Sequence, residues 1–113
     1  MNLIDDRDAE AYDKPVVSVI KVKIDPKDAA GLLAKTLDGL AAEGNKNLPG
    51  FLTAQVLLSV DNRTIVVLSE WSDRHAWGKS RYDPIVESLL EDCYAKAIAI
   101  EFEIYTRRGE LAR

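Results

Sequence analysis

The sequence has very little cysteine, histidine and methionine, with one residue of each. The single cysteine, Cys93, cannot form a disulfide within the chain, and no group of Cys and His residues has the spacing of a metal site. A glycine loop for phosphate, a Ser-His-Asp arrangement and a nicotinamide fingerprint are missing as well. We therefore expect a protein that carries no metal, flavin or nicotinamide cofactor.

Long apolar runs and clusters of basic residues are also lacking. No segment approaches the roughly 20 consecutive apolar residues of a membrane helix. The first 13 residues contain no basic stretch followed by an apolar core, the pattern of a secretory signal. We expect a soluble, cytoplasmic protein with no membrane partner. The 15 Lys and Arg residues are scattered and the net charge is −4, which counts against a nucleic-acid partner.

What remains is an ordinary globular composition on a short chain. The 113 residues are 47% hydrophobic and 30% charged, which predicts one small domain. Residues 1–14 are polar and show no sustained period, so we expect an N-terminal tail there. The domain itself is predicted over residues 15–107, and residues 108–113 form a C-terminal tail.

Alternation of apolar and polar residues predicts four strands, over 16–24, 51–60, 64–71 and 98–106. The turn-like residues 61–63 join the second and third strands as a hairpin. In the last strand Glu101 and Glu103 share one face. We interpret them as charges that protect an edge strand from aggregation, although two such carboxylates can also share a proton.

Two helical regions lie between these strands. Asp-Pro dipeptides at 25–26 and 83–84 place a capping carboxylate before a proline at the first helical position. Apolar residues at three- and four-residue spacing predict a helix over 26–43, with Gly44 as its stop. A second helix begins after Ser72-Asp73 and continues beyond residue 84, so it is predicted to be broken.

The order of elements, β-α-β-β-α-β, predicts a ferredoxin-like split βαβ fold of the α+β class. In it, two helices cover one face of a four-stranded antiparallel sheet. The other face would carry an apolar patch that a second copy of the chain could cover. We assign to this open face Val19, Phe51, Leu57, Val67 and Trp71. In such a homodimer, Thr53, Gln55 and Ser69 would face a cavity between the paired sheets.

Three short motifs carry a resemblance to a known family. They are Pro49-Gly50-Phe51 at the start of a strand, Ser69-Glu70-Trp71-Ser72-Asp73 at the end of the next, and Asp83-Pro84 in the following helix. Together they resemble the antibiotic biosynthesis monooxygenase (ABM) superfamily of dimeric α/β-barrel proteins, over residues 16–106. The resemblance implies a homodimer in which each subunit has its own pocket, between the sheet and the helices or at the barrel mouth.

The resemblance also implies candidate reactions. Some members oxygenate polycyclic aromatic phenols to quinones without flavin or metal, whereas others degrade haem or act on small signalling molecules. The tryptophan at the strand end of the oxygenases falls on Trp71. Their asparagine falls on Val67, their tyrosine on Trp77 and their helical arginine near Leu90 or Glu91, while the axial histidine of the haem-degrading relatives falls on Arg81.

Two hypotheses about function follow. The first is a cofactor-independent monooxygenase-like protein that acts on a small aromatic or phenolic molecule. The alternative is a non-catalytic dimeric module that binds a small molecule in the same cavity, which the departures from the family pattern favour. For either, we expect the pocket to be lined by Phe51, Gln55, Val67, Ser69, Trp71, Trp77, Arg81 and Tyr82.

Several of these residues have a purely structural alternative. Trp71 could fill a core or a dimer seam, and Trp77 could pack the broken helix against the sheet instead of closing the pocket. Arg81 and Tyr82, which could orient an anionic substrate, also suit a surface loop. His75 is the natural candidate for a general base, but its place in a first helical turn favours a solvent-exposed side chain. Cys93 lies on the apolar stripe of its helix, which favours an inert buried thiol.

Overall fold

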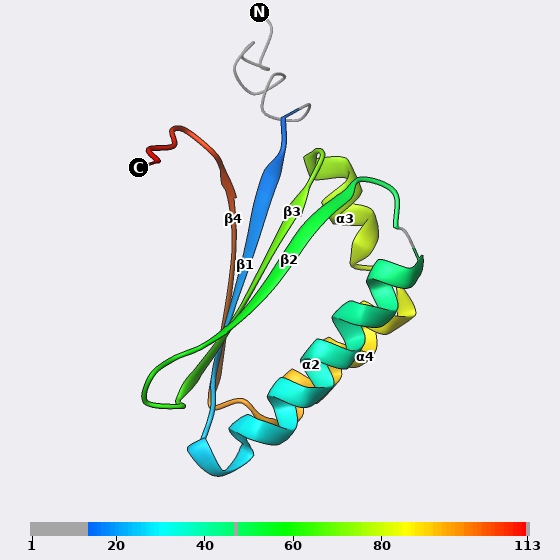
Figure 1. The fold of residues 1–113 in the computed structure, drawn as a ribbon. Coiled ribbons are helices and arrows are strands. Elements are labelled where there is room, and N and C mark those ends of the chain that lie inside the picture. Colours follow the sequence, from blue (N-terminus) through cyan, green and yellow to red (C-terminus); the bar gives the residue numbers. More distant parts are fainter. Residues whose placement is uncertain (1–13, 47, 113) are drawn as a thin grey trace, which may run out of the picture.

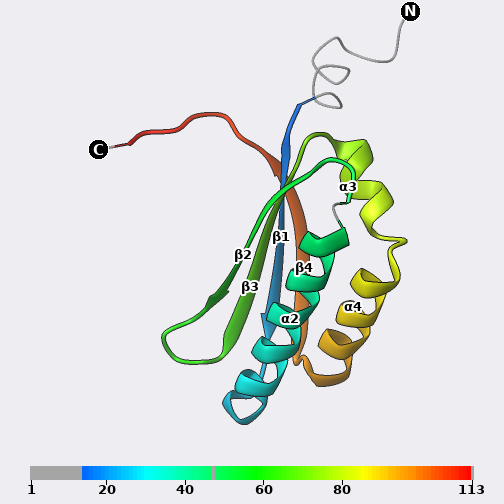
Figure 2. The same ribbon diagram turned by 45° about the vertical axis from the view of Figure 1, so that its right-hand side comes forward.

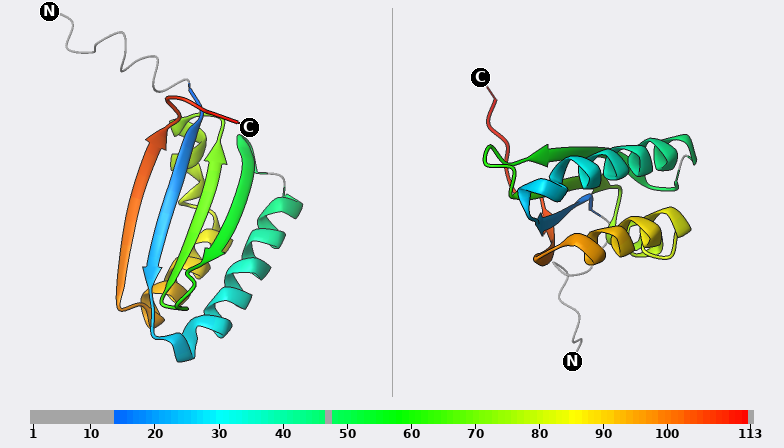
Figure 3. Two further views of the ribbon diagram at one scale, coloured as in Figure 1. Left: turned by 60° about the vertical axis from the view of Figure 1, so that its left-hand side comes forward. Right: turned by 90° about the horizontal axis from the view of Figure 1, so that it is seen from below.

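The sheet has four antiparallel strands in the computed structural model, which describes residues 14–46 and 48–112. The strands are β1 (Val16–Lys23), β2 (Phe51–Leu58), β3 (Thr64–Trp71) and β4 (Ala99–Thr106). Their order across the sheet is β2-β3-β1-β4, so β4 is an edge strand, as expected (Figure 3). The predicted ferredoxin-like α+β fold is confirmed.

Within the described residues, three helices accompany the sheet: α2 (Pro26–Lys46), α3 (Arg74–Ser80) and α4 (Pro84–Lys96). Helices α2 and α4 lie side by side over one face of the sheet, and α3 lies near the end of β3 (Figures 1 and 2). The predicted break between α3 and α4 is confirmed. The predicted stop at Gly44 is wrong, because α2 continues to Lys46. A glycine inside a helix costs only about 1 kcal/mol, which the rest of a long helix easily offsets.

Capping carboxylates explain where the two shorter helices begin. Asp73 Oδ1 accepts a hydrogen bond of 2.7 Å from the backbone N–H of Ala76, and Asp83 Oδ1 accepts one of 2.8 Å from Ile85. Each carboxylate satisfies a backbone donor that has no partner within the helix. The two caps therefore restart the helix after the turn and fix the position of Arg81 between α3 and α4.

The hydrophobic core lies between α2, α4 and the centre of the sheet. Apolar side chains that face each other across this layer remove most of their surface from water, which is the main force that holds the helices on the sheet. The buried core cluster consists of Val22, Ile24, Ala29, Leu32, Ile65 and Cys93.

The pairing of β1 with β3 decides which residues of β3 face the helices. Val16 pairs with Trp71 and Val22 pairs with Ile65, and all four are buried. Alternation then places Val67 on the same side. The prediction that Val67 and Trp71 lie on the open face is wrong. Residues 64–71 are apolar on both faces of the strand, so their pattern alone does not indicate which face is covered.

A β-bulge in β2 reverses the side on which Phe51 lies. Phe51 pairs with Trp71 and Thr53 pairs with Glu70, so Leu52 is an extra residue between them. An extra residue shifts the alternation by one position. Phe51 therefore turns toward the helices, with its ring centroid 5.3 Å from that of Trp71. The prediction that Phe51 lies on the open face is wrong for this reason.

The face of the sheet opposite the helices keeps an apolar character in this chain. Leu57 and Tyr105 are 48% and 52% exposed there, and Val19 is half-buried. Charged side chains border this patch. Glu70 of β3 forms an ion pair with Arg107, which follows β4, and the distance from Glu70 Oε1 to Arg107 Nη2 is 3.4 Å. We call this surface the open face.

Two further predictions concern the ends of the chain. Of the predicted N-terminal tail, residues 1–13 lie outside the described residues. Residues 107–112 form neither helix nor strand, and the domain boundaries stay a prediction. Within the described ranges, every helix is too short or too polar to cross a membrane.

Candidate functional site

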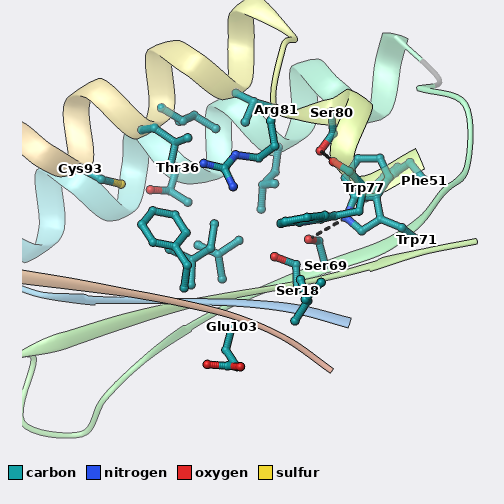
Figure 4. A pocket seen from close by; sticks show the side chains of 18 residues that line it. Ser18, Thr36, Phe51, Ser69, Trp71, Trp77, Ser80, Arg81, Cys93 and Glu103 are labelled. Atoms are coloured by element: carbon teal, nitrogen blue, oxygen red, sulfur yellow. Dashed lines mark hydrogen bonds between the residues drawn. The ribbon is translucent and has the colours of Figure 1, made fainter. Parts of the chain in front are cut away.

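A pocket of about 260 Å³ lies between the sheet and the helices (Figure 4). Its volume is near the lower end of the range for small-molecule sites, roughly 300–1,000 Å³, so it suits a compact ligand. The sheet contributes Ser18, Ile20, Phe51, Val67, Ser69, Trp71, Phe102, Glu103 and Ile104 to its lining. The helices and the turn between them contribute Thr36, Leu40, Trp77, Ser80, Arg81, Val86, Leu89, Leu90 and Cys93.

Aromatic side chains form one end of this pocket. Trp71 is only 4% exposed and its ring meets that of Phe51 at 57°. The indole Nε1–H donates a hydrogen bond of 3.0 Å to Ser69 Oγ, so the one polar atom of the Trp71 ring is satisfied. Trp77 reaches the same space from α3. Flat, apolar surfaces of this kind suit a planar ring, which can stack on them or meet them edge to face.

Arg81 brings a positive charge to the mouth of the pocket. Its guanidinium carbon lies 5.7 Å from the ring centroid of Trp77 and 5.4 Å from that of Phe102. Both contacts have cation–π geometry and hold the head group over apolar rings. In the described ranges no carboxylate forms an ion pair with Arg81. Figure 4 shows the guanidinium directed from the helices toward the sheet.

Two of the pocket's hydroxyl groups are already used within the chain. Thr36 Oγ1 donates a hydrogen bond of 2.8 Å to the carbonyl of Leu32, and Ser80 Oγ donates to the carbonyl of Trp77. These groups stabilise α2 and α3, and they offer no free proton to a ligand. The hydroxyl groups of Ser18 and Ser69 lie on the opposite wall, which is the sheet.

The structure brings together most of the residues expected at the site, although on the helix side of the sheet and not between two sheets. Two of the eight lie elsewhere. Gln55 pairs with Leu68 on the open face, because β2 regains its alternation after the bulge. Tyr82 is 82% exposed in the turn before α4, since that turn is closed by backbone hydrogen bonds and leaves its ring outside. The six that line the pocket are Phe51, Val67, Ser69, Trp71, Trp77 and Arg81.

Sequence reasoning missed Ser18, Thr36 and Phe102 as pocket residues. Ser18 carries a usable signal, because it is a polar residue on a strand face that is otherwise apolar, between Val16 and Ile20. Thr36 and Phe102 carry none, since threonine within a helix and phenylalanine within a strand are ordinary core residues.

The other residues considered for chemistry lie away from the pocket or are inert. His75 is exposed on α3 and does not line the pocket. Glu103 borders the pocket from β4, but its carboxylate points away from the pocket in Figure 4. Burial, with a smaller effect of the Asp92 charge, raises the pKa of the Cys93 thiol, which keeps it protonated. Residues 14–46 and 48–112 contain no cluster of side chains that could hold a metal ion.

Comparison with known proteins places this arrangement among related folds. A family model described as "Antibiotic biosynthesis monooxygenase" matches residues 15–86, which is more than half of the chain. No curated protein matches the sequence.

Several solved structures share the fold at low sequence identity. A protein of Caulobacter crescentus is 19% identical, with a TM-score of 0.77 over 93% of this chain and 100% of its own. Rv0793 of Mycobacterium tuberculosis is 14% identical, with a TM-score of 0.75 over 88% of this chain and 100% of its own. SnoaB, a cofactor-independent oxygenase from Streptomyces nogalater, is 20% identical, with a TM-score of 0.69 over 88% of this chain and 99% of its own.

Proposed function

Since this chain belongs to the antibiotic biosynthesis monooxygenase family, we propose that it binds a small planar phenol in the pocket and oxygenates it without a cofactor. The observation that carries the proposal is the position of Arg81, a cation held over two aromatic rings at the mouth of an apolar pocket. SnoaB, which shares the fold, is itself a cofactor-independent oxygenase.

The pocket favours the reactive form of a phenol, which is the phenolate. The aromatic wall of Phe51, Trp71 and Trp77 accepts the ring, and Arg81 then faces the phenolic oxygen. A nearby positive charge favours the ionised form and so lowers the pKa of the bound phenol. The released proton leaves to solvent through the mouth, where Arg81 is exposed.

A phenolate ring can supply the electrons that oxygen requires. One oxygen atom of O₂ becomes the second carbonyl of the quinone and the other leaves as water, so the ring provides all four electrons. The apolar walls exclude water and confine the reactive intermediate until this is complete. Arg81 stabilises the negative charge that stays on the oxygens during the transfer.

A titration with α-naphthol tests the proposal. Quenching of the two pocket tryptophans should report binding, and oxygen uptake with formation of naphthoquinone should report turnover in metal-free, flavin-free protein. Arg81→Met keeps a long unbranched side chain but removes its charge, and we expect roughly a three- to tenfold loss of affinity because Arg81 is exposed to solvent. Arg63→Met, in the turn between β2 and β3, removes the same charge far from the pocket. Failure of naphthol and its analogues to bind at all would overturn the proposal.

A specific observation also favours the alternative, a module that binds the small molecule without reaction. Among the residues that line the pocket in the described chain, none presents a carboxylate or an imidazole to take the phenolic proton. The same titration separates the two functions. Binding without oxygen uptake above that of a protein-free control would identify the module.

We further propose that a second copy of the chain covers the open face. Leu57 and Tyr105 are large apolar side chains that stay about half exposed on the two edge strands of this face, and exposed apolar side chains commonly mark contact sites. The resemblance to dimeric α/β-barrel proteins supports the same arrangement. The pocket lies on the other side of the sheet, so each subunit would hold a complete pocket.

A further inference from the structure

Ser18 has a buried hydroxyl group that makes no hydrogen bond to another described residue. Only 5% of the residue is exposed, and its side chain lines the pocket. The other two buried polar residues of the described part of the chain, Thr36 and Ser80, each donate to a backbone carbonyl. A buried hydroxyl without a partner costs free energy, so its presence in a pocket points to a ligand that supplies the partner.

Ser69 places a second hydroxyl beside it. The two serines are directly paired neighbours on β1 and β3, which puts their side chains next to each other on the same face. Ser69 Oγ already accepts the indole Nε1–H of Trp71, at 3.0 Å, so its own proton remains available to donate. The hydrogen bond from Trp71 polarises this hydroxyl and makes it a better donor. In Figure 4 both oxygens rise from the sheet toward the pocket.

Two neighbouring hydroxyl donors match the two lone pairs of a carbonyl oxygen. We propose that Ser18 and Ser69 together bind a carbonyl group of the ligand, so that the ligand of this pocket is an aryl ketone that also carries a phenol. This inference rests on the proposed function, in which the phenolic oxygen faces Arg81 on the helix side. A carboxylate suits the serine pair poorly, because two neutral hydroxyl groups bring no positive charge to balance it.

A pair of matched ligands tests the ketone directly. A hydroxytetralone joins a phenol ring to a cyclic ketone, and the matching tetrahydronaphthol lacks only the carbonyl oxygen. Isothermal titration calorimetry of the full chain should give about three- to tenfold tighter binding for the ketone, the usual worth of one or two net hydrogen bonds.

Serine variants show whether the preference arises at this pair. In Ser18→Ala the preference for the ketone should shrink to about twofold or less, and thermal stability should stay equal or rise because an unpaired hydroxyl is removed. Ser59→Ala is the control, since it removes a hydroxyl that is bonded within the turn between β2 and β3, outside the pocket lining. It should lower thermal stability and leave the ratio of the two affinities unchanged. Comparing this affinity ratio between the wild type and each variant also cancels the effect of the carbonyl on the acidity of the phenol, because every protein is titrated with both ligands.

The outcomes separate this inference from the proposed function. Equal affinity of the wild-type chain for the two ligands overturns the ketone site and leaves the phenol pocket standing. So does a preference that persists in Ser18→Ala, or a loss of stability in that variant, which would show a structural hydroxyl. If neither ligand binds, the phenol pocket itself fails and the ketone site fails with it.

Discussion

Trp71 is both a buried residue and part of the pocket wall. Its ring meets Phe51 and its Nε1–H donates to Ser69, but the pocket leaves part of its surroundings without protein atoms. We expect Trp71→Phe to remain folded and to lose about 1–2 kcal/mol of unfolding free energy, for the lost hydrogen bond and a smaller ring.

Denaturant unfolding measures that loss. Trp71→Ala serves as the reference and should lose about 3–5 kcal/mol, the usual cost of truncating a core aromatic. Naphthol binding, followed through Trp77, should weaken in Trp71→Phe. Unfolding of Trp71→Phe, together with no response of Trp77→Phe to any phenol, would make Trp71 purely structural.

Cys93 allows a prediction about pH. Burial raises the pKa of its thiol in the folded chain above the value in the unfolded chain, so the folded state holds its proton to higher pH. The stability that Cys93 contributes is therefore complete below the unfolded pKa and declines as the pH rises past it.

Thiol labelling and unfolding at several pH values check this. A thiol reagent should modify Cys93 far more slowly in the native chain than in denaturant. Cys93→Ala should show a flatter decline of stability above about pH 8.5 than the wild type. Rapid labelling of the native chain would contradict the buried position.

Among the connecting elements, the turn at Gly50 is the most constrained. Gly50 has a φ of +80°, and a Cβ there would meet the side chains of Ala76 and Ser72. We expect Gly50→Ala to cost about 1–3 kcal/mol, because both the backbone and the packing against α3 oppose it. Gly31→Ala is the matched control. It lies within α2 with no atom near its Cβ, and should gain about 0.5–1 kcal/mol. Thermal unfolding should give a lower melting temperature than the wild type for Gly50→Ala and a higher one for Gly31→Ala. An unchanged melting temperature of Gly50→Ala would contradict the prediction.

The order of the elements and most of their boundaries were predictable from the sequence, although α2 continues past the predicted stop at Gly44. The faces of the strands were only partly predictable. Capping carboxylates and Asp-Pro dipeptides act locally, so the break between α3 and α4 could be placed from a few residues. The side of Phe51 depends on a bulge at Leu52, and a bulge is decided by the partner strand. The candidate site shows the same distinction between features that local residues decide and features that strand pairing decides. Trp71 and Arg81 were identified as candidates, but the wall they share with Ser18 exists only through the pairing of β1 and β3.

At the scale of the whole molecule, the open face predicts a dimer. Sedimentation equilibrium at micromolar concentration should give about twice the chain mass of 12.6 kDa. Leu57→Lys should shift the equilibrium to the monomer by placing a charge in the buried contact. Leu37→Lys is the control, because Leu37 is 50% exposed on α2, away from the open face, and Leu57 is 48% exposed. A monomeric wild type, or equal dissociation by both variants, would contradict the proposal.

The sheet is one residue thick, and its two surfaces serve different purposes. Along β1, Val16, Ser18 and Ile20 face the helices, whereas Val17 and Val19 belong to the open face. Because neighbouring residues of a strand point to opposite faces, the deletion of one residue from β1 would exchange the side chains of the two faces from that point onward. A substitution or a two-residue change in β1 would leave both sets of side chains on their own faces. A one-residue insertion would do so only where a bulge absorbs the extra residue, as the bulge at Leu52 does in β2.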